Sequence, residues 1–393
     1  MTAAADDPQS GQGPLAGQGP LAGLRVVELA GLGPAPYCAM LLADLGADVV
    51  RVDRPGQPED PPWPVLGRGR RSVMIDLKNP SGPDALLAII DRADVLLEPF
   101  RPGVAERLGI GPDVCRRRNR GLVYGRMTGW GQTGPWRQMA GHDIDYIAVT
   151  GALHAIGRAG GPPQVPLNLL GDFAGGSMFL LAGVLAALLE RERSGQGQVV
   201  DASIVDGTAS LTAFVHGVRA AGIWRDERGV NPLDTGAPYY DVYETADGQW
   251  MAVGAIEPAF FAELIRLLEI EDAPPQHDQS RWPELRSALA RRFAERTRDE
   301  WTAVFAATDA CVAPVLSFAE AAGNPQLADR ETLVTRDGVL QPAPAPRFSR
   351  TPGRISGPAP VAGAHSREVF DRWGIGGAAD WLRSGALVEP TRD

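Results

Sequence analysis

Cysteine is scarce in this chain of 393 residues, which contains only Cys38, Cys115 and Cys311. The number is odd and no two cysteines form a CxxC pair, so neither a disulfide framework nor a zinc site is indicated. Histidine is also sparse, with five residues and no HExxH pattern. We therefore expect reduced thiols, a cytoplasmic protein and chemistry without a metal.

Basic charge is in short supply as well. The net charge is −10 and Lys78 is the only lysine. An acidic chain offers no basic surface to nucleic acid, so an anionic ligand would need a local cluster of arginines. The longest apolar run, residues 173–190, is short and glycine-rich for a membrane span. We expect a buried helix there, and neither a nucleic acid nor a membrane as a partner.

The amino-terminal residues lack the basic start and apolar core of a signal peptide. They are acidic and rich in glycine and proline, and we expect residues 1–20 to be a disordered leader. The remainder has a globular composition, with 44% apolar and 22% charged residues. Its length predicts two domains.

Short apolar runs alternate with helical periods through the first 200 residues. We expect strands at 24–29, 47–53, 72–77, 94–100 and 121–127. This alternation predicts an α/β fold, in which a Rossmann-like, open and mostly parallel sheet carries helices on both faces. Ligands of such sheets bind beyond the carboxyl ends of the strands.

The pattern changes after a polar, glycine-rich stretch at 222–238. A hairpin turning at Asp247-Gly248 and several helices follow, which predicts a small α+β domain at 223–339. A proline-rich linker then leads to a closing helix that we expect to return to the first domain. The large domain would therefore comprise 21–222 and 340–393.

A dinucleotide fingerprint is present only in part. Gly31 and Gly33 follow the first strand and Asp53 ends the second, as in nicotinamide-binding proteins. Pro34 and Pro36 occupy the turn and the helix start, where they remove N–H donors that a pyrophosphate would need. This substitution argues against a nicotinamide cofactor.

Basic residues follow several of the expected strands. Any one of them is better explained as surface charge, but together they predict a cationic rim suited to a phosphate-bearing ligand such as coenzyme A. The rim would comprise Arg54, Arg68, Arg70, Arg71, Lys78, Arg101 and Arg107.

Three other residues each admit a structural and a functional interpretation. His142 lies beside Asp143 in GHDIDY and could simply be a satisfied partner at a helix start. Asp172 stands at the expected start of the long apolar helix, where it could be a cap or could face a ligand near free backbone N–H groups. Glu257 precedes Pro258 and a helix, which is again typical of a cap.

Several motifs in order resemble one known family. The segments VVELAGLGPAPY, RGRRSVMIDLK, LLEPFRPGVAERLG, GHDIDY, LNLLGDFAGG and AIEPAFF are similar to the class III CoA-transferase superfamily, and within it to the α-methylacyl-CoA racemase branch. The resemblance runs from about residue 20 to about residue 350. One departure is Asp145, where asparagine is common.

The resemblance implies an interlocked homodimer of two-domain chains that bind an acyl-CoA substrate and need no further cofactor. It implies that His142 and Asp172 are the two acid/base residues and that Glu257 pairs with the histidine across the subunit interface. It also implies CoA contacts in four motifs. These contacts are Arg54; Ile75, Asp76, Leu77 and Lys78; Pro99, Phe100, Arg101 and Arg107; and Gly141, His142, Asp143, Ile144, Asp145 and Tyr146.

The implied activity is that of an isomerase of branched-chain fatty acyl-CoA, which interconverts (2R)- and (2S)-2-methylacyl-CoA. Two bases on opposite faces of the α-carbon would act through an enolate. One alternative is a CoA-transferase that uses Asp172 as a nucleophile. Another is a non-catalytic acyl-CoA binding protein. The presence of both His142 and Glu257 favours the racemase.

Overall fold

The computed structural model describes residues 19–56 and 64–390, so the predicted leader at 1–20 lies almost wholly outside the described residues. Its contacts divide the chain into two units. The larger comprises residues 1–146, 168–210 and 331–393, and the smaller comprises 147–167 and 211–330. These limits differ from the predicted domains, because 147–167 and 211–222 group with the smaller unit and 331–339 group with the larger.

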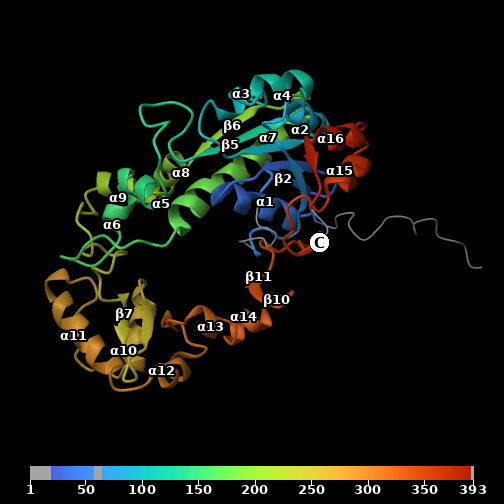
Figure 1. The fold of residues 1–393 in the computed structure, drawn as a ribbon. Helices are drawn as coiled ribbons and strands as arrows, with labels where there is room; N and C mark the ends of the chain where they lie inside the picture. Colours follow the sequence, from blue (N-terminus) through green and yellow to red (C-terminus); the bar gives the residue numbers. More distant parts are fainter. Residues whose placement is uncertain (1–18, 57–63, 391–393) are drawn as a thin grey trace, which may run out of the picture. The chain divides into compact units, whose positions relative to one another are not determined.

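A seven-stranded sheet forms the centre of the larger unit (Figure 1). Its strand order is β12-β3-β2-β1-β4-β5-β6, and all neighbours are parallel except β12, which runs antiparallel to β3. The strands are β1 (Arg25–Leu29), β2 (Asp48–Asp53), β3 (Arg71–Ile75), β4 (Val95–Glu98), β5 (Val123–Thr128), β6 (Val199–Ser203) and β12 (Leu387–Val388). The predicted α/β class with an open parallel sheet is confirmed, and the antiparallel edge strand β12 is an addition to it.

Helices cover both faces of this sheet because alternate strand residues point to opposite sides. Val26, Val49 and Leu97 belong to one core, which also contains buried residues of α1 and α7. Val27, Val50 and Leu96 belong to the other, with residues of α2 and α15. The helices are α1 (Pro34–Asp44), α2 (Gly82–Ile90), α3 (Val104–Arg107), α4 (Pro112–Arg118), α5 (Asp143–Val149), α7 (Met178–Ser194), α8 (Ile204–Leu211), α15 (Ser366–Arg372) and α16 (Ala378–Ser384). A hairpin of β10 (Leu333–Arg336) and β11 (Val339–Pro342) completes the larger unit.

The long apolar segment is helical, but it does not begin at Asp172 as predicted. A π-helical stretch, η1 (Leu169–Ser177), precedes α7, and Asp172 lies in its first turn with Asn168 in the cap position. The combined stretch Leu169–Ser194 is long and apolar enough to span a membrane by length and composition. Its residues Leu180 and Val184 are fully buried in the core beside β5 and β6.

The smaller unit is built on a three-stranded antiparallel sheet of β7 (Tyr240–Glu244), β8 (Trp250–Gly254) and β9 (Val312–Pro314). The first two strands form the predicted hairpin, and Gly248 in its turn has a φ of 71° that a side chain would strain. The helices of this unit are α6 (Ala152–Ala155), α9 (Ala213–Ala220), α10 (Pro258–Leu267), η2 (Gln279–Arg281), α11 (Trp282–Phe293), α12 (Arg298–Phe305), α13 (Phe318–Ala321) and α14 (Pro325–Asp329).

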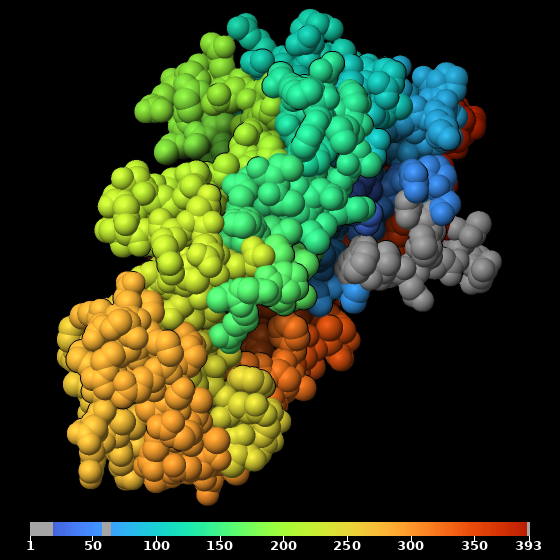
Figure 2. Space-filling view, turned by 90° about the vertical axis from the view of Figure 1, so that its left-hand side faces the viewer, coloured from blue at the N-terminus to red at the C-terminus, as the bar shows by residue number. Residues whose placement is uncertain are grey.

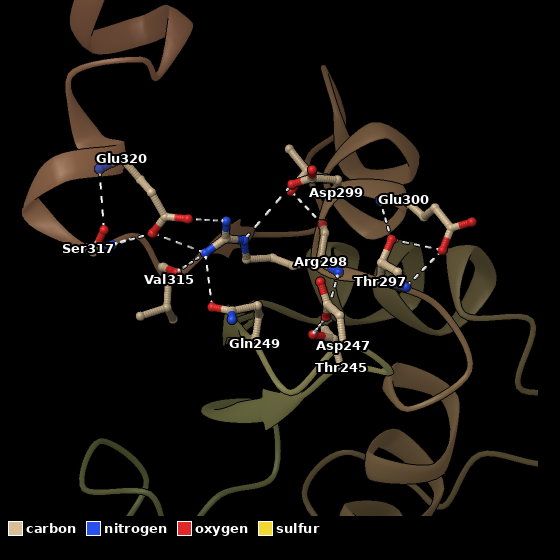
Figure 3. Close-up of polar contacts among 11 residues, drawn as sticks. Thr245, Asp247, Gln249, Thr297, Arg298, Asp299, Glu300, Val315, Ser317 and Glu320 are labelled. Atoms are coloured by element: carbon tan, nitrogen blue, oxygen red, sulfur yellow. Dashed lines mark hydrogen bonds and ion pairs between the residues drawn. The ribbon is translucent and has the colours of Figure 1, made fainter.

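Arg298 joins several elements of the smaller unit (Figure 3). Its guanidinium donates to Glu320, to the carbonyl of Val315 and to Gln249. Thr297 and Ser317 open α12 and α13 with reciprocal capping bonds to Glu300 and Glu320. Because Glu320 serves both a cap and the arginine, the start of α13 is tied to α12 and β8.

Candidate active site

A cavity of about 560 Å³ lies at the carboxyl ends of β1, β2 and β3. This is the edge where parallel sheets bind ligands, and it adjoins the point between β1 and β4 where the strand order reverses. Its walls comprise Leu29 to Leu32, Arg51 to Arg54, Ile75 to Lys78, Phe100, Val104, Leu108, Pro360 and Ala362. Residues far apart in sequence thus build one concave site.

Six of the predicted CoA-contacting residues line this cavity: Arg54, Ile75, Asp76, Leu77, Lys78 and Phe100. Arg54 and Lys78 are exposed, and among the described residues neither makes an ion pair. Their positive charges are therefore available to an anion at the cavity mouth. Pro99, Arg101 and Arg107 belong to the loop and helix that follow β4 and are not among the lining residues.

Three arginines of the predicted cationic rim do not belong to it. Arg68 and Arg70 come before β3 and Arg71 is its first residue, so none of the three follows a strand. Arg68 is buried and donates from Nε to Asp44 at 3.1 Å, and Arg70 is buried and donates from Nη1 to Glu28 at 2.6 Å. Arg71 pairs with Asp48 and Glu368. The rim prediction was wrong for these three residues, because acidic partners elsewhere in the sequence neutralise them.

Gly33, in the turn between β1 and α1, brings the cavity edge next to Asp172. Its φ is 67°, and a Cβ added there would lie 3.2 Å from Oδ2 of Asp172. A side chain at this position would therefore be strained and would press on the carboxylate. This glycine of the partial dinucleotide fingerprint thus makes room for an acidic side chain. The acidic residue of the same fingerprint, Asp53, accepts hydrogen bonds from Arg51 and Ser72.

Asp143 supports the turn that carries Asp172. Its buried carboxylate accepts a 2.6 Å hydrogen bond from the backbone N–H of Asp172 and a further backbone bond from Gly171. Burial raises the pKa of Asp143, and these two bonds oppose the rise. The other oxygen, Oδ1, is buried without a hydrogen-bond partner in the described chain. Two amides expected to face a ligand are therefore occupied by an acidic side chain.

The carboxyl group of Asp172 is half-buried and lies within electrostatic reach of His142. Burial raises its pKa, and the negative charge of Asp143 acts in the same direction. A hydrogen bond from Asn168 and the charge of His142 oppose this rise. Asp172 therefore holds a proton more readily than an exposed aspartate, and the structure brings together the two predicted acid/base residues.

His142 is exposed and stands at the start of α5. Its backbone N–H donates to Asp145 at 2.9 Å, and its carbonyl accepts from the N–H of Asp145 and of Tyr146. The Asp145 side chain thus caps the helix in the manner of an acidic residue in the first turn. These bonds fix the backbone of His142 while its imidazole remains open to solvent.

Tyr146 packs beneath the histidine loop. Its hydroxyl donates to the carbonyl of Gly141, and its ring meets Trp130 edge to face at 4.8 Å. Any Cβ on Gly129 or Gly141 would overlap that ring, so both positions require glycine. Burial raises the pKa of Tyr146 to about 12, Asp172 adds to the rise, and Arg101 opposes it. Predicted residues from three motifs are therefore close enough to interact electrostatically.

The loop from β5 to α5 is exposed along most of its length. Residues 133–140 all lie at the surface, in the blue-green part of Figure 2. Trp136 of this loop meets Trp130 edge to face at 5.0 Å. An aromatic series from Trp136 through Trp130 to Tyr146 therefore supports the backbone that carries His142.

Glu257 belongs to the smaller unit, where it precedes α10 at the cap position. It makes no side-chain capping bond and is exposed. Burial raises the pKa of Cys311, and the nearby Glu257 carboxylate adds to the rise. The structural interpretation as a side-chain cap is therefore wrong, and the carboxylate is open to another partner.

Sequence reasoning missed several residues of the cavity. Arg51, Pro360 and Ala362 line the cavity. Arg51 lies inside a strand, and Pro360 and Ala362 follow it by more than 300 residues in the sequence. No local pattern marks them. In residues 19–56 and 64–390, no three His, Cys, Asp or Glu side chains are grouped to hold a metal ion.

Residues 21–366 match the model of CoA-transferase family III. The chain belongs to CoA-transferase family III. Within this family it is 47% identical to human alpha-methylacyl-CoA racemase, over 90% of this chain and 93% of that protein. It is 32% identical to succinyl-CoA–D-citramalate CoA-transferase of Chloroflexus aurantiacus, over 88% and 92% of the two chains.

A solved structure shares the fold of this chain. The crystal structure of a CaiB/BaiF family protein from Brucella suis is 24% identical and superposes with a TM-score of 0.79, covering 90% of this chain and 99% of that one. Both branches of family III, racemase and transferase, are represented among the relatives, and the racemase is the more similar of the two compared here.

Proposed function

We propose that this protein is a racemase that interconverts the (2R) and (2S) epimers of 2-methylacyl-CoA thioesters. The observation that carries the proposal is that Asp172 lies beside Gly33, the neighbour of cavity-lining Leu32, and within electrostatic reach of His142. The cavity with Arg54 and Lys78 would hold the CoA portion, and the thioester would extend toward the acid/base pair.

The chemistry requires one base to remove the α-proton and an acid on the opposite face to return one. At each turnover one group must begin protonated and the other deprotonated. The raised pKa of Asp172 favours this condition, because a carboxyl group that keeps its proton more readily can also act as the acid. The exposed imidazole of His142 is the complementary group, since an imidazole can act both as a general acid and as a general base.

The backbone N–H groups beside Asp172 are not free to stabilise an enolate oxygen. The N–H groups of Gly171 and Asp172 already donate to Asp143. We therefore propose that Asp143 is a positioning residue, which holds the η1 turn and sets the environment of Asp172 rather than abstracting a proton itself.

The racemase is favoured over the CoA-transferase alternative. A transferase needs only the aspartate as nucleophile, whereas the racemase also needs a second acid/base near it. His142 supplies that group here. The higher identity to a racemase than to a transferase supports the same choice.

We further propose that the protein acts as an interlocked homodimer in the cytoplasm, in which Glu257 of one chain approaches His142 of the other. The exposed and uncapped carboxylate of Glu257 supports this proposal. An ionised carboxylate beside the imidazole would favour its protonated form. The reaction needs no cofactor besides the CoA thioester that is its substrate.

A single assay separates the candidate functions. The protein is incubated in D2O with one epimer of a 2-methylacyl-CoA, with and without a free carboxylic acid as CoA acceptor. Deuterium at the α-carbon together with loss of chirality is the expected result. CoA transfer that depends on the acceptor, without exchange at the α-carbon, would establish the transferase instead. If neither reaction occurred, acyl-CoA binding would be the only remaining candidate function.

A further inference from the structure

One wall of the cavity comes from the loop that follows β4. Phe100, Val104 and Leu108 line the cavity, and Arg101 and Arg107 belong to the same segment. This segment, residues 99–108, contains only one short helix, α3, whose four residues cannot hold it in place alone. Its geometry must be maintained by contacts with the sheet.

Glu98, the last residue of β4, makes the first of these contacts. Its side chain is fully buried, Oε1 accepts from the backbone N–H of Phe100 at 2.6 Å, and Oε2 accepts from Nε of Arg126 at 2.9 Å. One carboxylate therefore orients the backbone of a cavity residue and holds an arginine on β5.

Arg126 makes the second contact by reaching α3. It donates from Nη1 to Oε1 of Glu106 at 2.8 Å and from Nη2 to Oε2 at 3.4 Å. The Arg126 side chain is 8% exposed, whereas the Glu106 side chain is 46% exposed. The arginine thus bridges the start of the 99–108 segment, through Glu98, to its helix, through Glu106.

We propose that Glu98 is a positioning residue for acyl-CoA binding, which acts with Arg126 and Glu106 to hold residues 99–108 as a wall of the cavity. The inference rests on the proposed binding of acyl-CoA at this site. Glu98 would not contact the ligand, because the cavity lining includes Phe100 but not Glu98.

The charges around Glu98 make this anchor sensitive to pH. Burial raises the pKa of Glu98 to about 7, while Arg126 and the N–H of Phe100 act against the rise. The charged group facing it on β5 is Arg126, and the one on α3 is Glu106; Asp201 on β6 in turn faces Arg126. Tyr124 on β5 is near enough for the Glu98 charge to raise its pKa. Above pH 7 the ionised carboxylate binds Arg126 firmly, and below pH 7 its protonation weakens this anchor.

The test compares the wild type with Glu98→Gln, which keeps an acceptor for Phe100 but removes the charge. Binding of free coenzyme A is measured by calorimetry at pH 6, 7 and 8, and kcat and KM for racemisation are measured in parallel. At pH 8 we expect Glu98→Gln to bind CoA about 5-fold or more weakly, with kcat within about twofold of the wild type. At pH 6 the two proteins should converge. The titration of the CoA phosphates cancels because both proteins bind the same ligand.

Glu106→Gln is the graded control, since it removes the exposed end of the bridge and should weaken binding by less than about twofold. Equal CoA affinity of wild type and Glu98→Gln at pH 8, or a larger effect of Glu106→Gln, would overturn the role of Glu98. If the wild type bound no CoA and Lys78→Ala left KM for the acyl-CoA unchanged, the proposed function would fail instead of the role of Glu98.

A measurement on the wild type alone covers the case in which Glu98→Gln does not fold. Hydrogen exchange of residues 99–108 is followed at pH 6 and pH 8, corrected for intrinsic rates and compared with α2. We expect protection of 99–108 to be lower at pH 6 while α2 is unchanged. Equal protection of the segment at both pH values would contradict the proposal.

Discussion

Two sets of charged side chains in the larger unit differ in how they are partnered. In the segment that leads into β3, Arg68 and Arg70 are buried against Asp44 and Glu28. At the carboxyl ends, Arg54 and Lys78 are exposed around a cavity. Both sets are basic residues next to strands, yet the first is neutralised inside the fold and the second is available to a ligand.

The comparison teaches that the position of a charge along a strand matters less than what lies opposite it. A buried pair contributes to the fold only while both partners remain, because a single buried charge is strongly unfavourable. An exposed, unpartnered charge contributes little to stability and can serve binding. Mutations in the buried set should therefore be measured by stability, and mutations in the exposed set by activity.

The largest effect is expected at the acid/base pair of the carboxyl edge. Asp172→Asn keeps the shape of the side chain but removes its acid/base function, and it should lower racemisation up to about 10⁴-fold. His142→Gln should do the same. α-Deuterium exchange measures the loss, and thermal unfolding should show a Tm close to that of the wild type. Normal turnover by either variant would refute the two-base assignment.

The next largest effect concerns the buried pairs. Arg70→Met leaves Glu28 buried without its partner, and we expect the free energy of unfolding to fall by about 3–5 kcal/mol. Urea denaturation measures the change. The double variant Glu28→Leu with Arg70→Met removes both charges and should recover much of the loss. If the double variant were no more stable than Arg70→Met, the uncompensated charge would not be the cause.

A smaller effect is expected for the exposed cavity cation. Lys78→Ala should raise KM for the acyl-CoA about 10-fold, the equivalent of about 1.4 kcal/mol, with kcat and Tm nearly unchanged. Steady-state kinetics at several salt concentrations measure it. The difference from the wild type should shrink at high salt because screening weakens the charge. A fall in kcat with constant KM would place the lysine in another role.

The smallest effect is expected for an exposed pair far from the cavity walls. Arg118 donates to Asp91 with side chains that are 43% and 33% exposed. Arg118→Ala should change the free energy of unfolding by less than about 1 kcal/mol and leave KM as it is. The same denaturation and kinetic assays apply. A change as large as that of Arg70→Met would mean that burial does not distinguish the two sets.

Much of the larger unit could be predicted from the sequence, because the apolar strands and intervening helices follow local periodicities. The placement of Lys78 and Arg54 at the cavity also follows, since each comes directly after a strand. Arg68 and Arg70 were misplaced because they come before β3 and do not follow a strand. Their partners Asp44 and Glu28 lie 24 and 42 residues away, and no local pattern reveals such pairings.

The sequence motifs predict residues of the candidate site, but they do not reveal the hydrogen bonds between those residues. His142 and Asp172 could be assigned through motifs that resemble a known family. The hydrogen bond from the Asp172 N–H to Asp143 spans 29 residues, and it occupies a backbone N–H group that could otherwise face a ligand. The π-helical start of the long helix was not predictable either, because its side-chain pattern is the same as that of an α-helix.

The carboxyl-terminal segment has a consequence for synthesis of the protein. The N–H of Gly363 donates to the hydroxyl of Ser72 on β3, and the hydroxyl of Ser366 accepts from the N–H of Met74. Leu387 of β12 pairs with Ile75 at the edge of the sheet. Pro360 and Ala362 complete the cavity wall. The ribosome must therefore release almost the entire chain before this binding site can close, whereas the elements of the smaller unit are all synthesised earlier. A nascent chain that stops before residue 355 would carry the proposed acid/base pair but lack two residues of the cavity wall.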